Sequence, residues 1–230
     1  MQTMKEAPAV LHELFSMIHH IRKMERGTFL FQEGSYANEF YIIKSGILQI
    51  SKIIPDGREL TLKMCTNGDF VGGTDLFVPD GKYLLSGRVA ESGEVAVIMK
   101  DTLEEKLSNN LPLALTFMKW MGLQNRKMQN KFRDLVLHGK KGALYSTLIR
   151  LSNSYGIKTT DGIMIRLPLT NQELANFCGT SREVVNRLLS ELRKMGTISI
   201  EKGTITIHDM KYLKNEIDCE NCPIDICRID

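Results

Sequence analysis

The sequence predicts an α+β fold in which an antiparallel β jelly-roll precedes a long helix and a small helical domain that ends in a β-hairpin. Three observations lead to this prediction. Short β-rich segments with evenly spaced glycines fill the first half of the chain, and a helical pattern of about seven turns follows them. Two helix-start signals and a strictly alternating hairpin pattern then occupy the last third.

The β-rich part extends from about residue 24 to residue 100. Turn dipeptides recur there every eleven residues, at Ser45-Gly46, Asp56-Gly57 and Asn67-Gly68. The segments beside them, FYIIKSG, ILQISKI and ELTLKM, are rich in β-branched and aromatic residues. Even spacing of short strands and turns predicts a small sandwich or jelly-roll barrel, and we expect positive φ at both central residues of the turns.

The helical pattern extends from Pro112 to His138 and carries a single apolar stripe interrupted by one asparagine. The stripe consists of Leu115, Met118, Met121, Asn125, Met128, Phe132 and Leu135. Such a stripe predicts either a two-fold dimer or packing against the chain's own barrel. The segment HGKKG, which ends at Gly142, predicts a hinge, and a further amphipathic helix and a strand in DGIMIRLPL follow it.

The segment from Leu169 to Gly196 predicts a helix-turn-helix. Thr170 with Glu173, and Thr180 with Glu183, each fit the capping box that opens a helix. Because these starts lie ten residues apart, they predict one short helix, a turn and a second helix. The small and apolar residues that the packing needs are Ala175, Gly179, Val185 and Leu188.

The segment TISIEKGTITIH alternates around Lys202-Gly203 and predicts a β-hairpin wing, which completes a winged helix-turn-helix. Winged helices bind DNA, although some bind proteins instead. The second helix of such a domain enters the major groove with its first turns. The candidate DNA-binding residues are therefore Arg182, Glu183, Asn186 and Arg187. Arginine can pair with guanine and glutamate with cytosine; phosphate contact for the arginines, and capping alone for Glu183, are the alternatives.

Composition is that of an ordinary globular protein, with 43% apolar and 25% charged residues among 230. No apolar run approaches the ~20 residues of a membrane span, and no signal-peptide pattern opens the sequence. We therefore expect a cytoplasmic protein with reduced thiols and no membrane partner. Between Lys106 and Thr160 there are ten basic residues and one acidic residue, Asp134. This bias indicates either an anionic partner such as nucleic acid or a solvated basic helix face.

Three of the five cysteines, Cys219, Cys222 and Cys227, lie within the last dozen residues. Their C-x2-C-x4-C spacing offers three soft thiolate ligands to one centre, which is typical of zinc or an iron–sulfur cluster. Reversible thiol oxidation without a metal is a third possibility. Cys65 and Cys178 are expected to be buried core residues instead.

The combination of a glycine-punctuated barrel, a long helix and a winged helix with the segment TSREVVNR resembles the Crp/Fnr family of bacterial transcription regulators. In that family the pattern formed here by Ser181, Arg182, Glu183 and Arg187 resembles the version that reads a TGTGA half-site. The resemblance implies a homodimer that binds double-stranded DNA at a palindromic promoter site and contacts RNA polymerase. Because no cofactor fingerprint or catalytic triad is present, an enzyme is not expected.

The barrel departs from the cyclic-nucleotide-binding branch of that family. Those members resemble F-x-G-E-L followed by an Arg-Ser or Arg-Thr pair that holds the nucleotide. Here Gly73 stands at the Glu position, and Tyr83 and Leu84 stand at the Arg-Ser positions. Arg88 is the nearest basic residue, but its place on the strand predicts that it faces another direction. We therefore expect no cyclic nucleotide to bind.

The resemblance is strongest to the Fnr-type oxygen sensors of bacilli, which carry C-terminal cysteines on a [4Fe-4S] cluster. It implies a cluster bound by Cys219, Cys222 and Cys227, with Asp134 of the long helix as the fourth ligand. An ion pair of Asp134 with Lys131 or Lys141 is the alternative that the sequence alone supports. Asp218 and Asp225 are poor candidates because a ligand so near the cysteines would strain the chain.

These assignments divide the chain into a β-roll sensor-like domain (1–110), a dimerisation helix and hinge (111–141), a winged-helix DNA-binding domain (142–214) and a cluster-binding tail (215–230). The family resemblance implies an oxygen-responsive regulator of genes for anaerobic or nitrate respiration. The alternative is a Crp-like regulator that responds to a small ligand in the barrel and holds zinc in its tail.

Overall fold

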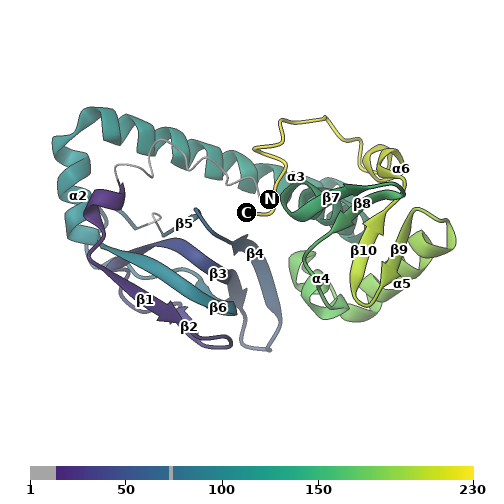
Figure 1. Cartoon of the computed structure of the whole chain (residues 1–230), viewed down its shortest axis with the longest axis horizontal. Helices are drawn as coiled ribbons and strands as arrows, with labels where there is room; N and C mark the ends of the chain where they lie inside the picture. Colours follow the sequence, from purple (N-terminus) through teal and green to yellow (C-terminus); the bar gives the residue numbers. More distant parts are fainter. Residues whose placement is uncertain (1–13, 73–74) are drawn as a thin grey trace. The chain divides into compact units, whose positions relative to one another are not determined.

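The computed structural model describes residues 14–72 and 75–230 of the chain (Figure 1). Its contacts divide the chain into two compact units. Among the described residues, the β-roll unit consists of 14–53, 62–72, 75–124 and Asp230, and the C-terminal unit of 54–61 and 125–229. The predicted architecture of an antiparallel β domain, a long helix and a C-terminal helix-turn-helix is confirmed. No helix within the two described ranges is long and apolar enough to cross a membrane.

The β-roll unit consists of a short 3-10 turn, an antiparallel sheet and the beginning of the helical part. The strands are β1 (His20–Met24), β2 (Phe29–Phe31), β3 (Glu39–Ile53), β4 (Glu59–Cys65), β5 (Phe70–Val71) and β6 (Ser86–Met99), preceded by η1 (Phe15–Met17). The sheet order is β1-β6-β3-β4, while β2 pairs with β6 and β5 with β3 (Figure 1). The helix α2 (Lys100–Asn109) follows β6 directly.

Residues 40–43 of β3 and 95–98 of β6 are buried on both faces of the sheet, which explains why these two short runs are entirely apolar. Tyr41 and Ile43 point into the barrel interior with Val95 and Val97. The alternate residues pack on the other face against α2 and the first turns of the following helix; they include Phe40, Ile42, Ala96 and Ile98, with Leu103, Leu107, Leu113 and Phe117 from the helices. Successive side chains of a strand point to opposite faces of the sheet, so each of these strands contributes to two separate cores.

The evenly spaced glycines have three different roles, so the prediction of three equivalent turns is wrong. Gly46 lies inside the continuous strand β3, at an irregularity in its pairing with β6, and a Cβ there would lie 2.6 Å from the carbonyl oxygen of Glu91. Only glycine permits this approach. Asp56-Gly57 does form a hairpin, but only Gly57 has positive φ, as in a three-residue loop. Asn67-Gly68 turns the chain between β4 and β5, which do not form a hairpin with each other.

The long helix α3 (Leu111–Tyr155) is interrupted at Gly139, whose φ of 57° and ψ of −155° are not helical. This break lies within residues 138–142, where the sequence predicts a hinge or a short break; motion about it stays a prediction. Before it, every apolar member of the predicted stripe is at least 38% exposed. A different face, with Leu113, Phe117 and Trp120, packs on the sheet. The stripe is thus left exposed by the residues that the structure describes.

The C-terminal unit contains a four-stranded sheet beside the helix-turn-helix. Its elements are β7 (Gly156–Thr159), β8 (Gly162–Ile165), α4 (Asn171–Phe177), α5 (Arg182–Lys194), β9 (Ile198–Glu201), β10 (Thr204–Ile207) and α6 (Met210–Asn215), and the sheet order is β7-β8-β10-β9 (Figure 1). The wing turn is confirmed, since Lys202 and Gly203 have φ of 48° and 81° as a two-residue type I′ hairpin requires. Strands β7 and β8 pair as a hairpin, and β7 was not predicted because its four residues are exposed and lack an apolar pattern.

One of the two predicted capping boxes is confirmed and the other is wrong. Thr170 accepts a hydrogen bond from the backbone N–H of Glu173, whose side chain accepts one from the backbone N–H of Thr170 in return. The second helix instead has Ser181 as its N-cap residue, with no side-chain capping bond. The Thr180 hydroxyl is buried and has no hydrogen-bond partner among the described residues. With the turn at Gly179 (φ 57°), the N-cap of α5 is Ser181, one residue later than the predicted Thr180.

Candidate functional site

The first turns of α5 present a polar, exposed surface opposite a buried one. Val185, Leu188, Leu189 and Leu192 are buried in the core of the C-terminal unit. The predicted DNA-binding residues all lie on the exposed side: Ser181, Arg182, Glu183, Asn186 and Arg187. The 3.6-residue period of the helix separates the two sets. Direct contact of each of these side chains with DNA stays a prediction.

Two details of this surface were not predicted. The side-chain amide of Asn171 in α4 donates a hydrogen bond of 3.1 Å to the side-chain oxygen of Asn186, which ties the two helices of the motif together. The Glu183 carboxylate has a lowered pKa, because the backbone N–H at the helix start and the Ser181 hydroxyl donate to it. Arg187 forms no ion pair with any described residue, so its guanidinium is available.

The three tail cysteines gather on one side of the C-terminal unit. Cys227 is buried, and Cys219 and Cys222 are half-buried against the same core. All three are free thiols. Burial raises the pKa of the Cys227 thiol to about 11, against the opposing effect of Arg150 and with a further contribution from the two other thiols.

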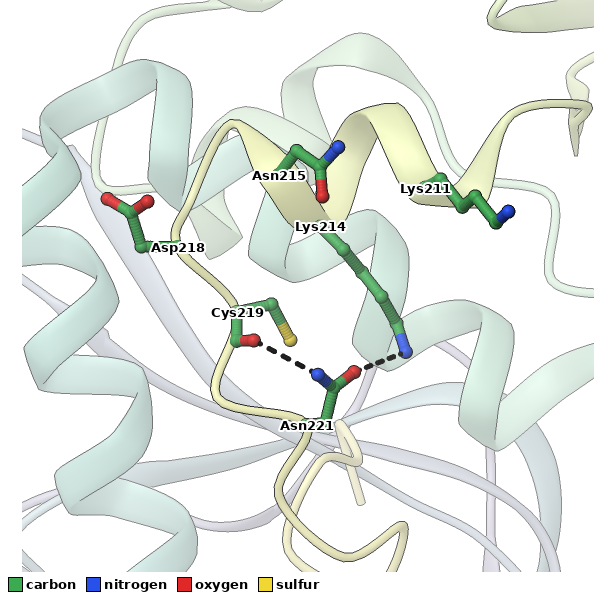
Figure 2. Close-up of a pocket in the computed structure, with 6 residues that line it drawn as sticks. All are labelled: Lys211, Lys214, Asn215, Asp218, Cys219 and Asn221. Atoms are coloured by element: carbon green, nitrogen blue, oxygen red, sulfur yellow. Dashed lines mark hydrogen bonds between the residues drawn. The ribbon is translucent and has the colours of Figure 1, made fainter.

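Cys219 faces an open pocket of about 620 Å³ (Figure 2). The pocket is lined by Lys211, Lys214, Asn215, Asp218, Cys219 and Asn221. Lys214 donates a 3.0 Å hydrogen bond to the side chain of Asn221, whose amide donates at 3.3 Å to the Cys219 carbonyl (Figure 2). Asp218 and Asn221 have positive φ, which these two residue types tolerate best after glycine. They shape the turn that presents Cys219.

The donor set fits an iron–sulfur cluster by type. Three soft thiols on one short segment, one of them buried, match the ligands that such clusters use. Within the described residues, no three His, Cys, Asp or Glu side chains stand close enough to hold a single metal ion.

Asp134 is buried, with only 2% of its surface exposed, and is held by three side chains. Ser146 and Arg150 donate to its Oδ2 atom at 2.5 and 2.8 Å, and Arg133 donates to Oδ1 at 2.8 and 3.1 Å. Burial alone would raise the pKa of this carboxyl group, but the hydrogen bonds from Ser146, Arg150 and Arg133 outweigh it and lower the pKa. The expected ion pair with Lys131 or Lys141 is not formed; Lys141 pairs with Glu216 instead.

Helix α3 anchors the tail through side chains that the sequence did not single out. Arg150 donates to the carbonyl of Ile226 at 3.2 Å, and Asn153 donates to the carbonyl of Cys227 at 2.7 Å. Ser154 accepts from the backbone N–H of Ile229 at 3.1 Å. Asn153 and Ser154 lie three and four positions after Arg150, so both lie on the helix face that carries Arg150. Polar residues at that spacing from Arg150 were the signal available in the sequence.

The barrel interior is filled by aromatic side chains. Tyr83 is 8% exposed and stacks on Phe31 with ring centroids 4.3 Å apart, and its hydroxyl donates to the carbonyl of Glu39. Arg88 is exposed between the buried Gly87 and Val89 and so points away from this interior, as predicted. Gly73, the other position of the comparison with nucleotide-binding barrels, lies outside the described residues.

Comparisons with known proteins agree with this arrangement. A Crp-like helix-turn-helix domain matches residues 142–216, and a cyclic nucleotide-binding domain matches residues 21–110. The "Anaerobic regulatory protein" of Bacillus subtilis is 55% identical over 96% of this chain and 93% of its own length. The "CRP-like cAMP-activated global transcriptional regulator" of Mycobacterium tuberculosis is 27% identical over 82% of this chain and 84% of its own.

Solved structures resemble the fold as well. The c-di-GMP-responsive global regulator CLP of Xanthomonas campestris has a TM-score of 0.72 and 26% identity, and the match covers 87% of this chain and 98% of that one. FixK2 of Bradyrhizobium japonicum has the same TM-score with 17% identity, over 85% of this chain and 96% of that one. At this lower identity the likeness concerns the fold alone.

Proposed function

The chain belongs to the Crp/Fnr family of DNA-binding transcription regulators, and from this premise we propose that it is an oxygen-responsive, cytoplasmic member that binds a [4Fe-4S] cluster. Members of this family regulate transcription and are not enzymes. The observation that carries the proposal is the gathering of Cys219, Cys222 and Cys227 on one core, beside the helix that contains Asp134.

The proposed DNA site is a palindrome with TGTGA-like half-sites. The exposed start of α5 carries Ser181, Arg182, Glu183 and Arg187 in the order of the family pattern for that half-site. A guanidinium reads guanine through two parallel hydrogen bonds, and a carboxylate accepts from the cytosine amino group. Reading two half-sites requires two copies of the domain, related by the symmetry of the palindrome.

The proposed partner in the dimer is a second copy of this chain. The exposed stripe on α3 includes Met118 and Phe132, each 66% exposed, and it continues along the helix for several turns. An apolar stripe of this length on an exposed helix, interrupted only by Asn125, favours a helical partner, and an identical stripe supplies one through a two-fold axis. RNA polymerase is the further partner that family membership implies.

The proposed sensor connects the tail to helix α3. Cys219, Cys222, Cys227 and Asp134 would hold the cluster, which supplies reactivity toward oxygen that protein side chains lack. Arg150 already joins the two parts, since it contacts both Asp134 and the carbonyl of Ile226. Ligands from both parts would tighten that connection, and loss of the cluster would relax it. The 55% identical relative is named an anaerobic regulator, which favours target genes of anaerobic or nitrate respiration.

Anaerobic purification tests this proposal most directly. We expect a brown protein with a broad visible absorbance, with iron and acid-labile sulfide in nearly equal amounts, and with bleaching in air. Stoichiometric zinc and a colourless protein would contradict it and favour a regulator with a zinc-bound tail. Substitution of Cys222 by Ser provides the control, because it removes one ligand from a half-buried position at little cost to the core.

We expect no binding of cyclic AMP at micromolar concentration. The ring of Tyr83 lies stacked on Phe31 in the barrel interior. The family resemblance assigns to this position the arginine that holds the phosphate in nucleotide-binding members. A buried phosphate needs a charged partner, and the phenol hydroxyl is already engaged with a carbonyl. Isothermal calorimetry with the purified dimer measures this, and a micromolar dissociation constant would show that the barrel does bind nucleotide.

A further inference from the structure

The two oxygens of the Asp134 carboxylate have different surroundings. Oδ2 is bound by Ser146 and Arg150, which are themselves buried and joined by a 3.0 Å hydrogen bond. Among the described residues, Oδ1 accepts hydrogen bonds from Arg133 alone, whose side chain is 26% exposed. One oxygen is therefore fixed by the core of the C-terminal unit, and the other is covered by a residue at its surface.

Arg133 is shared between two carboxylates. Its Nε and Nη2 atoms donate to Asp134, and its Nη1 atom donates to Glu220, which immediately follows Cys219 in the tail. The Glu220 side chain is 67% exposed, so it can follow the guanidinium as that group moves. Both carboxylates raise the pKa of Arg133, with Asp134 making the larger contribution. The arginine thus has a second partner that remains if its bonds to Asp134 are broken.

We propose that Arg133 covers the Oδ1 atom of Asp134 in the cluster-free protein, and that the Arg133 side chain moves toward Glu220 when Asp134 binds the cluster. We call Arg133 in this role a removable cap. The inference rests on the proposed role of Asp134 as the fourth ligand. Ser146 and Arg150 remain on Oδ2 and orient the carboxylate, as partners of metal ligands commonly do. Arg133 and Glu220 are therefore positioning residues, because they act on the cluster through Asp134.

A simple charge effect predicts the opposite result, which makes the proposal testable. A cluster with three thiolates and a carboxylate is anionic, so a nearby cation should stabilise it and a nearby anion should destabilise it. On that basis, removal of Arg133 would hinder cluster uptake and removal of the Glu220 charge would assist it. A removable cap requires the reverse, since Arg133 competes for Oδ1 and Glu220 relieves that competition.

The experiment compares Arg133→Gln and Glu220→Gln in the full-length protein. The matched controls are Lys141→Gln and Glu216→Gln, which remove the same charges from another ion pair between α3 and the tail, one that does not touch Asp134. The measured quantities are the rate of anaerobic cluster incorporation, followed by visible absorbance, and the final iron content. Unfolding curves of the cluster-free variants confirm that the fold is retained.

We expect Arg133→Gln to accelerate incorporation by up to roughly tenfold and Glu220→Gln to slow it by a similar factor, at the lower end of effects for partners of metal ligands. Ser146→Ala should reduce cluster retention because it frees the oriented oxygen Oδ2. The charge controls should stay close to the wild type. The reverse signs for Arg133→Gln and Glu220→Gln, or no difference from the controls, would overturn the cap.

This failure can be distinguished from failure of the proposed function. If the wild-type protein takes up no cluster, the proposed function is wrong. If it does and Asp134→Asn leaves the spectrum and iron content unchanged, Asp134 is not the fourth ligand. If Asp134→Asn loses iron but the Arg133 and Glu220 variants follow the charge effect, only the removable cap is wrong.

Discussion

Replacement of Asp134 by alanine should lower the free energy of unfolding of the cluster-free protein by about 3–5 kcal/mol. The carboxylate neutralises Arg150, whose side chain is 3% exposed, across a distance of 2.8 Å. Its removal leaves a buried guanidinium without its charged partner, and Ser146 loses its acceptor. Urea unfolding of the anaerobically prepared, cluster-free variant, followed by far-ultraviolet circular dichroism, measures this loss.

Two control variants distinguish the stability contributed by the buried Asp134–Arg150 pair from that contributed by the more exposed Asp134–Arg133 pair. Arg133→Ala removes the partly exposed partner of the same carboxylate, 26% exposed, and should cost no more than about 1 kcal/mol. The double variant Asp134→Ala with Arg150→Leu should recover a large part of the stability, because a hydrophobic pair of similar volume can replace a buried ion pair. A loss below about 1 kcal/mol for Asp134→Ala would contradict the burial of this pair. Asp134→Asn, which keeps the shape of the side chain, is accordingly the better variant for testing cluster ligation.

Replacement of Arg187 by alanine should weaken binding to a TGTGA palindrome by about 1–3 kcal/mol per half-site, or roughly 5- to 150-fold. Arg187 is exposed on the first turns of α5 and forms no ion pair among the described residues. Its guanidinium can therefore meet the O6 and N7 atoms of guanine together, an interaction that other bases do not offer. The loss should be concentrated at one guanine of each half-site.

Fluorescence anisotropy with matched and scrambled duplexes, each at two salt concentrations, measures this difference. Arg193→Ala removes the same charge from the last turn of α5 and serves as the control. A phosphate contact would weaken both duplexes alike and reduce the salt dependence. Equal losses on the two duplexes for Arg187→Ala would assign that residue to the DNA backbone instead.

Much of the C-terminal unit could be predicted because its signals are local. The capping box of Thr170 and Glu173, the glycine of the turn and the two-residue wing turn each depend on residues that are neighbours along the chain. The backbone conformations they require are set by sterics and by hydrogen bonds within four residues. The burial of Cys65 and Cys178 also followed from their residue type, and the pKa of Cys178 is raised to about 12 by that burial.

The remaining features depended on partners that are distant in sequence. Gly46 was expected in a turn, and it lies in a strand because the facing backbone near Glu91 leaves no space for a Cβ.

Asp134 shows the division between sequence and tertiary structure most clearly. The sequence by itself determined that a single carboxylate stands in a basic segment and that three thiols stand close together in the tail. Lysines near in sequence were reasonable partners for that carboxylate, but only the tertiary structure decided between them and Arg150, sixteen residues away. The physical reason is burial: in the core a charge needs both a countercharge and geometrically suitable donors, and Arg150 supplies them while it also holds the tail carbonyl of Ile226.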